Sequence, residues 1–154
     1  MNGIIGRQII INGVDIWEEY GVFLVEDKRG DLTNLSSILT PSKMKTHTGV
    51  DIRERNGKSY SSRLDVANEE RNVTLYFAQY AATKSAWLRK YTEFISFLKQ
   101  GQDGWLQIEF PSLSLTLRVF CSSFSGYKPL TYLWKEGVQA SKYKVTFTEP
   151  NPII

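Results

Sequence analysis

One helical pattern lies among a series of strand patterns, and this arrangement constrains the fold more than any other feature of the sequence. Apolar and polar residues alternate in short runs on both sides of the helical segment, which predicts half-buried strands. The clearest runs are residues 73–77, 106–110, 113–119 and 143–147. A doubly wound parallel sheet needs helices that alternate with strands, so the pattern excludes it. The sequence predicts a mainly β fold of the α+β kind, an antiparallel β-sandwich or barrel with one packed amphipathic helix.

The helix is expected at about residues 84–100. Its large apolar side chains recur every three or four residues and share one face, whereas its charged side chains fall elsewhere. This core stripe consists of Trp87, Tyr91, Phe94, Ile95 and Leu98. Thr83 or Ser85 can cap the amino end, and Gly101 stands where many helices end in a left-handed residue. We expect the stripe to pack on a sheet.

The chain opens with the signal of a tight hairpin. Asn12-Gly13 lies between β-branched residues and favours a two-residue turn, because both turn positions take positive φ. With 154 residues, of which 42% are hydrophobic and 23% charged, the sequence fits one globular domain over residues 1–154. No apolar run approaches the roughly 20 residues that cross a bilayer, so we expect no membrane partner.

A polar stretch from about residue 27 to 72 departs from this pattern. It holds many charged residues and turn formers, yet residues 50–55 and 59–64 show partial alternation around Asn56-Gly57. A connection of about 45 residues is far longer than those usually found between elements of a compact domain. We interpret this stretch as a long protruding β-hairpin arm.

Catalytic chemistry finds little support in the sequence. The chain has one histidine, His47, and one cysteine, Cys121, whereas a zinc site needs three or four such ligands. Glycine-rich phosphate loops of the two common patterns do not occur. We therefore expect no catalytic site, no metal and no cofactor. A hydrolase with Cys121 or a serine as nucleophile is the least favoured hypothesis.

The arm carries the candidate interaction residues. Within residues 41–63, six lysines and arginines stand against Asp51 and Glu54, which gives a local net charge of +4. The subunit-interface candidates are Lys43, Lys45, His47, Arg53, Arg55, Tyr60 and Arg63. Three interpretations stay open: a solvated loop, an arm that docks on a neighbouring subunit, and a nucleic-acid groove in which Tyr60 offers a stacking ring.

Three segments follow one another along the chain in a recognisable order. They are the opening IINGVDI at residues 10–16 with Tyr20-Gly21-Val22 after it, the strand NVTLYF at 72–77 before the helix, and the closing KVTFTEP at 144–150. In order and spacing, this series resembles the distal tail proteins and related tail-tube-like subunits of long-tailed bacteriophages. The resemblance covers nearly the whole chain.

The resemblance implies a β-sandwich flanked by a helix that assembles into a homo-oligomeric ring, commonly a hexamer, where the tail tube meets the baseplate. Its partners would be further copies of itself and neighbouring tail-tube and baseplate proteins, and DNA would only pass non-specifically through the ring. We expect a non-enzymatic structural subunit of a phage or prophage tail, located in the virion tail and made in the host cytoplasm. The alternative is a β-barrel module that binds single-stranded nucleic acid, although a net charge of +3 does not demand a polyanion.

Overall fold

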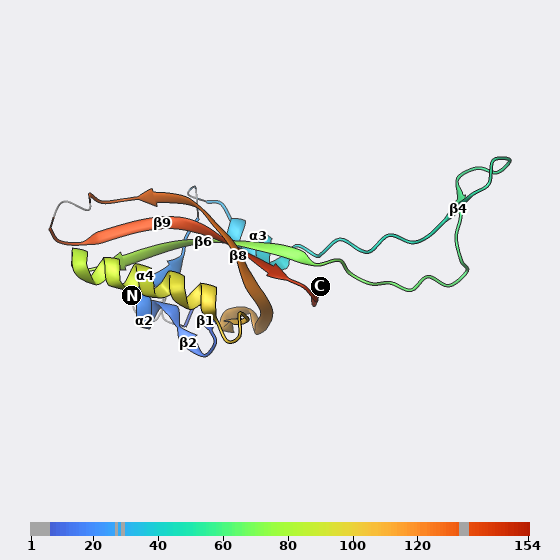
Figure 1. Cartoon of the computed structure of the whole chain (residues 1–154). Coiled ribbons are helices and arrows are strands. Elements are labelled where there is room, and N and C mark those ends of the chain that lie inside the picture. Colours follow the sequence, from blue (N-terminus) through green and yellow to red (C-terminus); the bar gives the residue numbers. More distant parts are fainter. Residues whose placement is uncertain (1–6, 27, 29, 133–135) are drawn as a thin grey trace.

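A curled antiparallel sheet forms the body of the molecule, and a thin arm extends far from it (Figure 1). The computed structural model describes residues 7–26, 28, 30–132 and 136–154. Within these residues, seven strands follow the order β2-β1-β7-β8-β9-β6-β3 across the sheet. They are β1 (Ile10–Ile11), β2 (Val14–Asp15), β3 (Val22–Leu24), β6 (Arg71–Ala81), β7 (Leu106–Phe110), β8 (Leu115–Pro129) and β9 (Gln139–Glu149).

Helices occupy a minor part of the described chain. They are α2 (Ile16–Tyr20), α3 (Thr33–Leu39), α4 (Lys84–Gln100) and the short 3-10 helix η1 (Pro111–Leu113). A separate two-stranded hairpin, β4 (Val50–Asp51) with β5 (Lys58–Ser59), lies on the arm. The predicted class, a mainly β fold with an antiparallel sheet, is confirmed, and the sheet curls into a half-barrel.

The opening hairpin forms as the sequence predicts. Ile11 pairs with Val14, and the turn between them has positive φ at Asn12 (50°) and Gly13 (80°). The short helix α2 follows directly and ends at Gly21, whose φ is 68°. A Cβ atom at Gly21 would lie 2.3 Å from the carbonyl oxygen of Tyr80, so this position needs glycine for space as well as for its backbone angle.

Strand β8 belongs to both halves of the curled sheet. Its residues 115–119 pair with β7, and its residues 120–129 pair with β9. Register shifts between Cys121 and Ser123 and between Ser125 and Lys128 interrupt the second ladder, and such bulges bend a strand. The same shifts disturb the alternation of side chains, which explains why the sequence of residues 122–129 shows no strand pattern.

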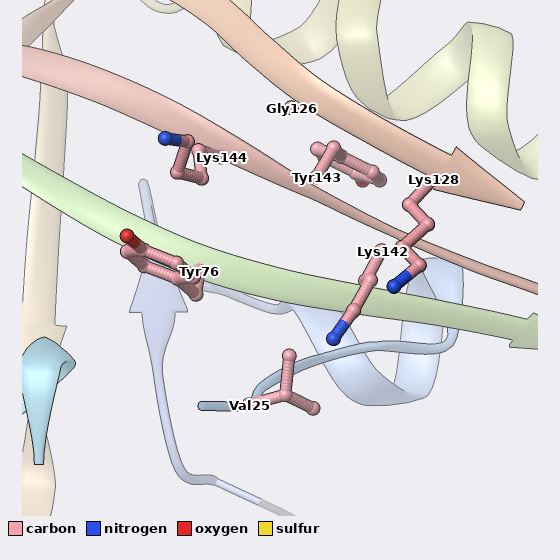
Figure 2. Close-up of a pocket in the computed structure, with 7 residues that line it drawn as sticks. All are labelled: Val25, Tyr76, Gly126, Lys128, Lys142, Tyr143 and Lys144. Carbon is pink, nitrogen blue, oxygen red and sulfur yellow. The ribbon is translucent and has the colours of Figure 1, made fainter. Parts of the chain in front are cut away.

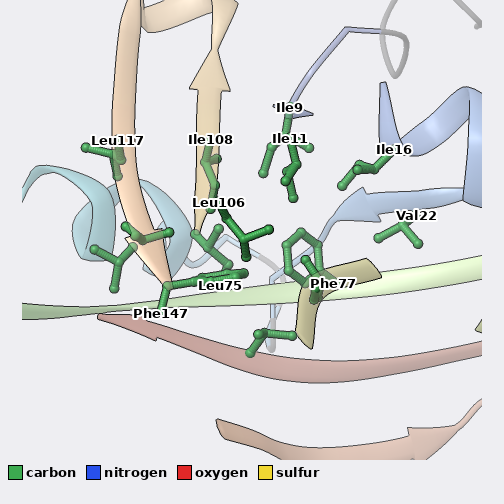
Figure 3. Packing of buried hydrophobic residues seen from close by; sticks show 14 of the residues in the cluster. Ile9, Ile11, Ile16, Val22, Leu75, Phe77, Leu106, Ile108, Leu117 and Phe147 are labelled. Atoms are coloured by element: carbon green, nitrogen blue, oxygen red, sulfur yellow. The ribbon is translucent and has the colours of Figure 1, made fainter. Parts of the chain in front are cut away.

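The hydrophobic core lies inside the curl, where side chains from both halves of the sheet meet (Figure 3). Its most deeply buried members include Ile9, Ile11, Ile16, Val22, Leu75, Phe77, Leu106, Ile108, Leu117 and Phe147, each at most 1% exposed. The inward positions of β6, β7 and β9 alternate with outward ones, as the period-two patterns predict. Core packing therefore fixes which face of each strand points outward.

Helix α4 lies across one side of this core, at the bounds expected from its periodicity. Thr83 caps it, because the Thr83 hydroxyl oxygen accepts the Ala86 N–H at 3.2 Å. Its stripe faces the body: Trp87, Phe94 and Leu98 are buried, whereas Tyr91 and Ile95 are half-buried against the core. Phe94 meets Phe77 edge to face at 5.9 Å between ring centroids, which anchors the helix on β6.

Helix α3 is a correction to the predicted arm of residues 27–72. It packs along β6, and its Asn34 and Ile38 are buried. Asn34 accepts the N–H of Tyr76 at 2.7 Å, and Ser37 accepts the N–H of Thr74 at 2.8 Å. These contacts cover the edge of β6 beyond the end of β3. The arm itself is therefore shorter, from residue 41 to 70.

The tertiary role of the α4 stripe can be tested with two substitutions on the same helix. The Trp87→Ala variant should lose about 3–5 kcal/mol of unfolding free energy, because it leaves a cavity in place of a buried ring. The Leu88→Ala variant should lose less than about 1 kcal/mol, since Leu88 is 53% exposed. Chemical denaturation measures both, and equal small losses would contradict this account of the helix.

Candidate functional site

The arm is the most unusual feature of the molecule (Figure 1). Residues 41–70 leave the body and return to it in two extended passes. Near the root an isolated antiparallel bridge between Met44 and Asn68 joins the two passes: the Lys45 N–H donates to the Ala67 carbonyl at 2.8 Å, and the Glu69 N–H donates to the Lys43 carbonyl at 2.7 Å. The backbone pairing gives the arm a defined exit from the body.

The arm ends in the small hairpin of β4 and β5. Its turn closes at Gly57, where φ is 68°. The ring of Tyr60 lies over Gly49 on the other pass, so close that a Cβ atom at Gly49 would be 2.7 Å from the ring. An aromatic ring over a glycine is a common way to fill the space beside a strand without a side chain. The tip thus has local order of its own.

Burial does not stabilise the arm within one chain. Every residue from 41 to 70 is described, and each is exposed or half-buried. The exposed large apolar side chains of this segment are Met44, Val50, Tyr60, Leu64 and Val66. Ordering so many residues costs conformational entropy that an exposed hairpin regains poorly. A surface outside the chain would supply the missing contacts.

The seven predicted interface residues all lie on the arm, spread from its root to its tip rather than gathered in one cluster. Lys43 and Lys45 are at the root, and Arg53 and Arg55 lie between β4 and β5. Arg63 lies 3.8 Å from Asp65 with both side chains more than 90% exposed, so this ion pair adds little stability. This arrangement is suited to contacts along the length of the arm.

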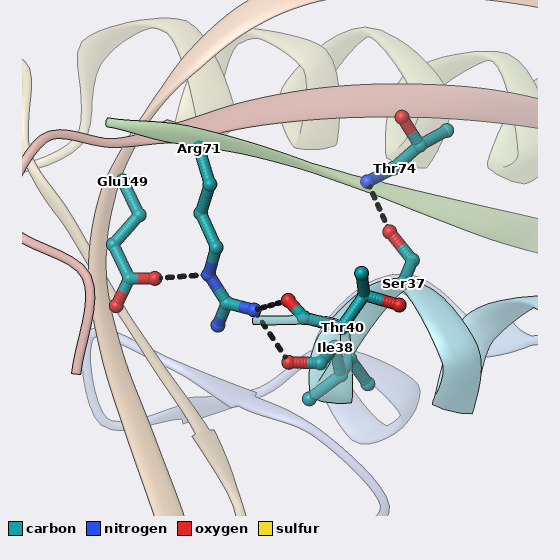
Figure 4. A network of polar contacts seen from close by, with 6 residues as sticks. All are labelled: Ser37, Ile38, Thr40, Arg71, Thr74 and Glu149. Atoms are coloured by element: carbon teal, nitrogen blue, oxygen red, sulfur yellow. Dashed lines mark hydrogen bonds and ion pairs between the residues drawn. The ribbon is translucent and has the colours of Figure 1, made fainter. Parts of the chain in front are cut away.

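A buried polar network holds the root of the arm (Figure 4). Arg71 begins β6 where the arm returns, and its Nε atom donates to a Glu149 carboxylate oxygen at 2.5 Å. Its Nη1 atom donates to the carbonyls of Ile38 at 2.9 Å and Thr40 at 2.7 Å, at the end of α3. Both charged side chains are at most 6% exposed. Sequence analysis missed this pair because its partners are far apart along the chain.

Cys121 has the environment of a structural thiol. It lies in β8, is half-buried and packs against the core, whereas His47 lies on the arm. Burial raises the pKa of the Cys121 thiol to about 11, against a smaller opposite effect of Lys99. At neutral pH such a thiol is almost entirely protonated and is a poor nucleophile. The environment of Cys121 therefore does not favour its use as a nucleophile.

A second polar surface lies on the outer face of β6 and β9 (Figure 2). Its pocket holds about 160 Å³, and Lys128 and Lys142 point into the same space. The Lys144 ammonium lies 5.6 Å from the ring centroid of Tyr76, at cation–π distance. Three lysines and one ring make this face suited to an anionic partner.

The described residues give no indication of a metal centre or a membrane span. They hold no group of three or more histidine, cysteine, aspartate or glutamate side chains placed to bind a metal ion. Within the same part of the chain, no helix combines the length and the apolar character needed to cross a bilayer.

Comparison with known proteins identifies a similar fold. No family model and no curated protein sequence matches the chain. The solved structure of the Dit protein (gp 19.1) of SPP1, described as a paradigm of the hub adsorption apparatus in phages that infect Gram-positive bacteria, has a similar fold with a TM-score of 0.57 and 13% identity. The match covers 92% of this chain and 49% of that one, so this chain spans about half the length of that protein.

The polar network at the root of the arm predicts that removal of one charge of the Arg71–Glu149 pair destabilises the protein more than removal of both charges. The Arg71→Met variant should lose about 3–5 kcal/mol of unfolding free energy, because it leaves the Glu149 carboxylate buried without its partner. The double variant Arg71→Met/Glu149→Leu should be more stable than the single one, since it removes both charges. Denaturation of the three proteins tests this. A double variant less stable than Arg71→Met would contradict it.

The state of the Cys121 thiol can be measured by alkylation. At pH 8 a pKa of about 11 leaves about a hundredfold less thiolate than in an unfolded chain with an ordinary cysteine. Iodoacetamide should therefore modify Cys121 about a hundredfold more slowly in the folded protein than in urea. Similar rates in the two states would indicate an accessible, reactive thiol and would restore the nucleophile hypothesis.

Proposed function

We propose that this chain is a non-enzymatic structural subunit of a phage or prophage tail, a distal tail or tube-like protein that assembles into a ring. The observation that carries the proposal is the arm, whose 41–70 segment buries no residue within its own chain. The similarity of the body to the SPP1 Dit fold supports a role of the same kind. The ring would form part of the virion tail.

The arm is suited to join copies of the chain because it reaches far enough. Half of residues 41–70, at about 3.3 Å per extended residue, spans about 50 Å when fully extended. A compact body of this size is about 35 Å across. An arm that starts on one subunit can thus cross the face of the next. A contact in which the arm of one copy docks on a different surface of the next copy is head-to-tail, and such contacts close into rings when the rotation permits.

The proposal extends to the partners of the ring. We infer a homo-oligomer, with six subunits as the number that the resemblance implies, stacked against neighbouring tail-tube and baseplate proteins. DNA would pass through the ring without specific contacts. The interface candidates from Lys43 to Arg63 would contact the neighbouring subunit through their charges and through Tyr60.

Binding of single-stranded nucleic acid is the second candidate, and the lysine face favours it. Lys128, Lys142 and Lys144 with Tyr76 combine positive charge with a ring on which a base could stack. Salt-sensitive binding of an oligonucleotide by the monomer would favour this function over the first. Ring formation in the absence of nucleic acid would favour the tail subunit.

Deletion of the arm separates folding from assembly. A variant that lacks Lys43 to Arg63 should stay folded, with a melting temperature within a few degrees of the parent, because the deleted segment contributes nothing to the core. It should no longer form the ring. Native mass spectrometry over a concentration series measures the assembly, and circular dichroism measures the melting temperature.

A variant with residues 43–63 in scrambled order serves as the control for arm length. It should also fail to assemble if the arm makes sequence-specific contacts. A deletion variant that still forms rings of parental stability would refute the role of the arm. A parent chain that stays monomeric at high concentration and within purified tails would refute ring formation itself.

A further inference from the structure

An apolar groove lies beside the root of the arm. Helix α3, strand β3 and the 3-10 helix η1 enclose about 340 Å³ there. The buried side chains of Ile38 and Phe110 form its floor. Leu35 and Leu113, which are 39% and 38% exposed, line it from α3 and η1. Residues of α3, β3 and η1 thus give the groove its shape.

The apolar surface continues along the outer side of α3. Leu32, Leu35 and Leu39 follow one another at helical spacing and are 67%, 39% and 45% exposed. The opposite side of the helix carries the buried Asn34 and Ile38. A short helix that is apolar on its solvent side, next to an apolar groove, is typical of a surface that another segment covers.

The charges of the groove and the arm are complementary. Among the described residues that line the groove there is no lysine or arginine, and Glu26 supplies a carboxylate. Glu26 is held in place because it accepts the N–H groups of Thr33 at 2.8 Å and Asn34 at 3.3 Å. The arm segment 41–63 carries a net charge of +4, whereas Asp65, Glu69 and Glu70 lie on the returning pass. The outgoing pass, in which Lys43 and Lys45 flank the apolar Met44, therefore complements the groove best.

We propose that this groove receives the arm of a second copy of the chain. The inference rests on the proposed function and adds the receiving surface to it. Met44, Leu64 and Val66 of the arm are 49%, 46% and 65% exposed and need apolar contacts. The arm of the same chain points away from the body, so it does not fill the groove (Figure 1). Each copy then offers one arm and one groove, and a head-to-tail series of such contacts closes into a ring when the rotation between copies permits.

A pair of matched substitutions tests the groove. Leu35→Glu places a charge in the groove, whereas Leu88→Glu places one on the exposed side of α4, where Leu88 is 53% exposed. Leu35→Glu should raise the concentration at which half the chains are assembled by at least about tenfold, with an unchanged melting temperature. Leu88→Glu should assemble like the parent. Assembly of Leu35→Glu at the parental concentration would overturn the proposal.

Cross-linking identifies the occupant directly and does not depend on the charge variant. A photoreactive benzophenone side chain replaces Leu113, and isotopically heavy and light chains are mixed before assembly. The expected product joins position 113 of one chain to residues 43–66 of a chain with the other label. Rings that form without this product, or with cross-links to another segment, would overturn the groove while ring assembly stands. A parent that forms no ring refutes the proposed function itself.

Discussion

The buried ion pair between Arg71 and Glu149 determines where the folded body ends and the arm begins. It joins the first residue of β6 to the last residue of β9. The same guanidinium binds the carbonyls of Ile38 and Thr40, so the end of α3 is fixed to the sheet at this point as well. These hydrogen bonds offset the cost of removing two charges from water. Both passes of the arm thus leave from one anchored site.

Periodicity in the sequence predicts the parts of the fold whose residues interact with near neighbours. The Asn12-Gly13 turn, the alternating strands and helix α4 are of this kind, and the structure has them where the patterns place them, except that the run predicted at residues 113–119 becomes strand only from Leu115, after η1. Helix α3 is different, because Thr, Asn and Ser are weak helix formers and Leu32 provides no side-chain cap. Its support comes from Glu26, β6 and Arg71, which no local pattern reveals.

The candidate site likewise has features that local sequence patterns predict and features that depend on tertiary contacts. The length and polarity of the stretch before β6 predict an arm, but its start at residue 41 depends on the tertiary contacts of α3. The groove cannot be predicted from a local pattern, since Leu35 and Phe110 come from distant parts of the chain. The acidic residue of the closing Glu149-Pro150 pair is visible as a motif, whereas its physical role as the partner of Arg71 requires the structure.

Strand β9 lies between β6 and β8, so the sheet cannot close until residue 149 has left the ribosome. Strand β6 ends at Ala81, but its partner β9 is complete only when the chain has been made up to Glu149. Synthesis of the intervening residues takes about 3–14 s at common rates of translation. During this time the inward side chains of Val73, Leu75 and Phe77 lack their β9 neighbours. Pairing over such sequence separations is intrinsically slow. We expect the yield of folded protein to depend on this interval more than on the stability of the finished sheet.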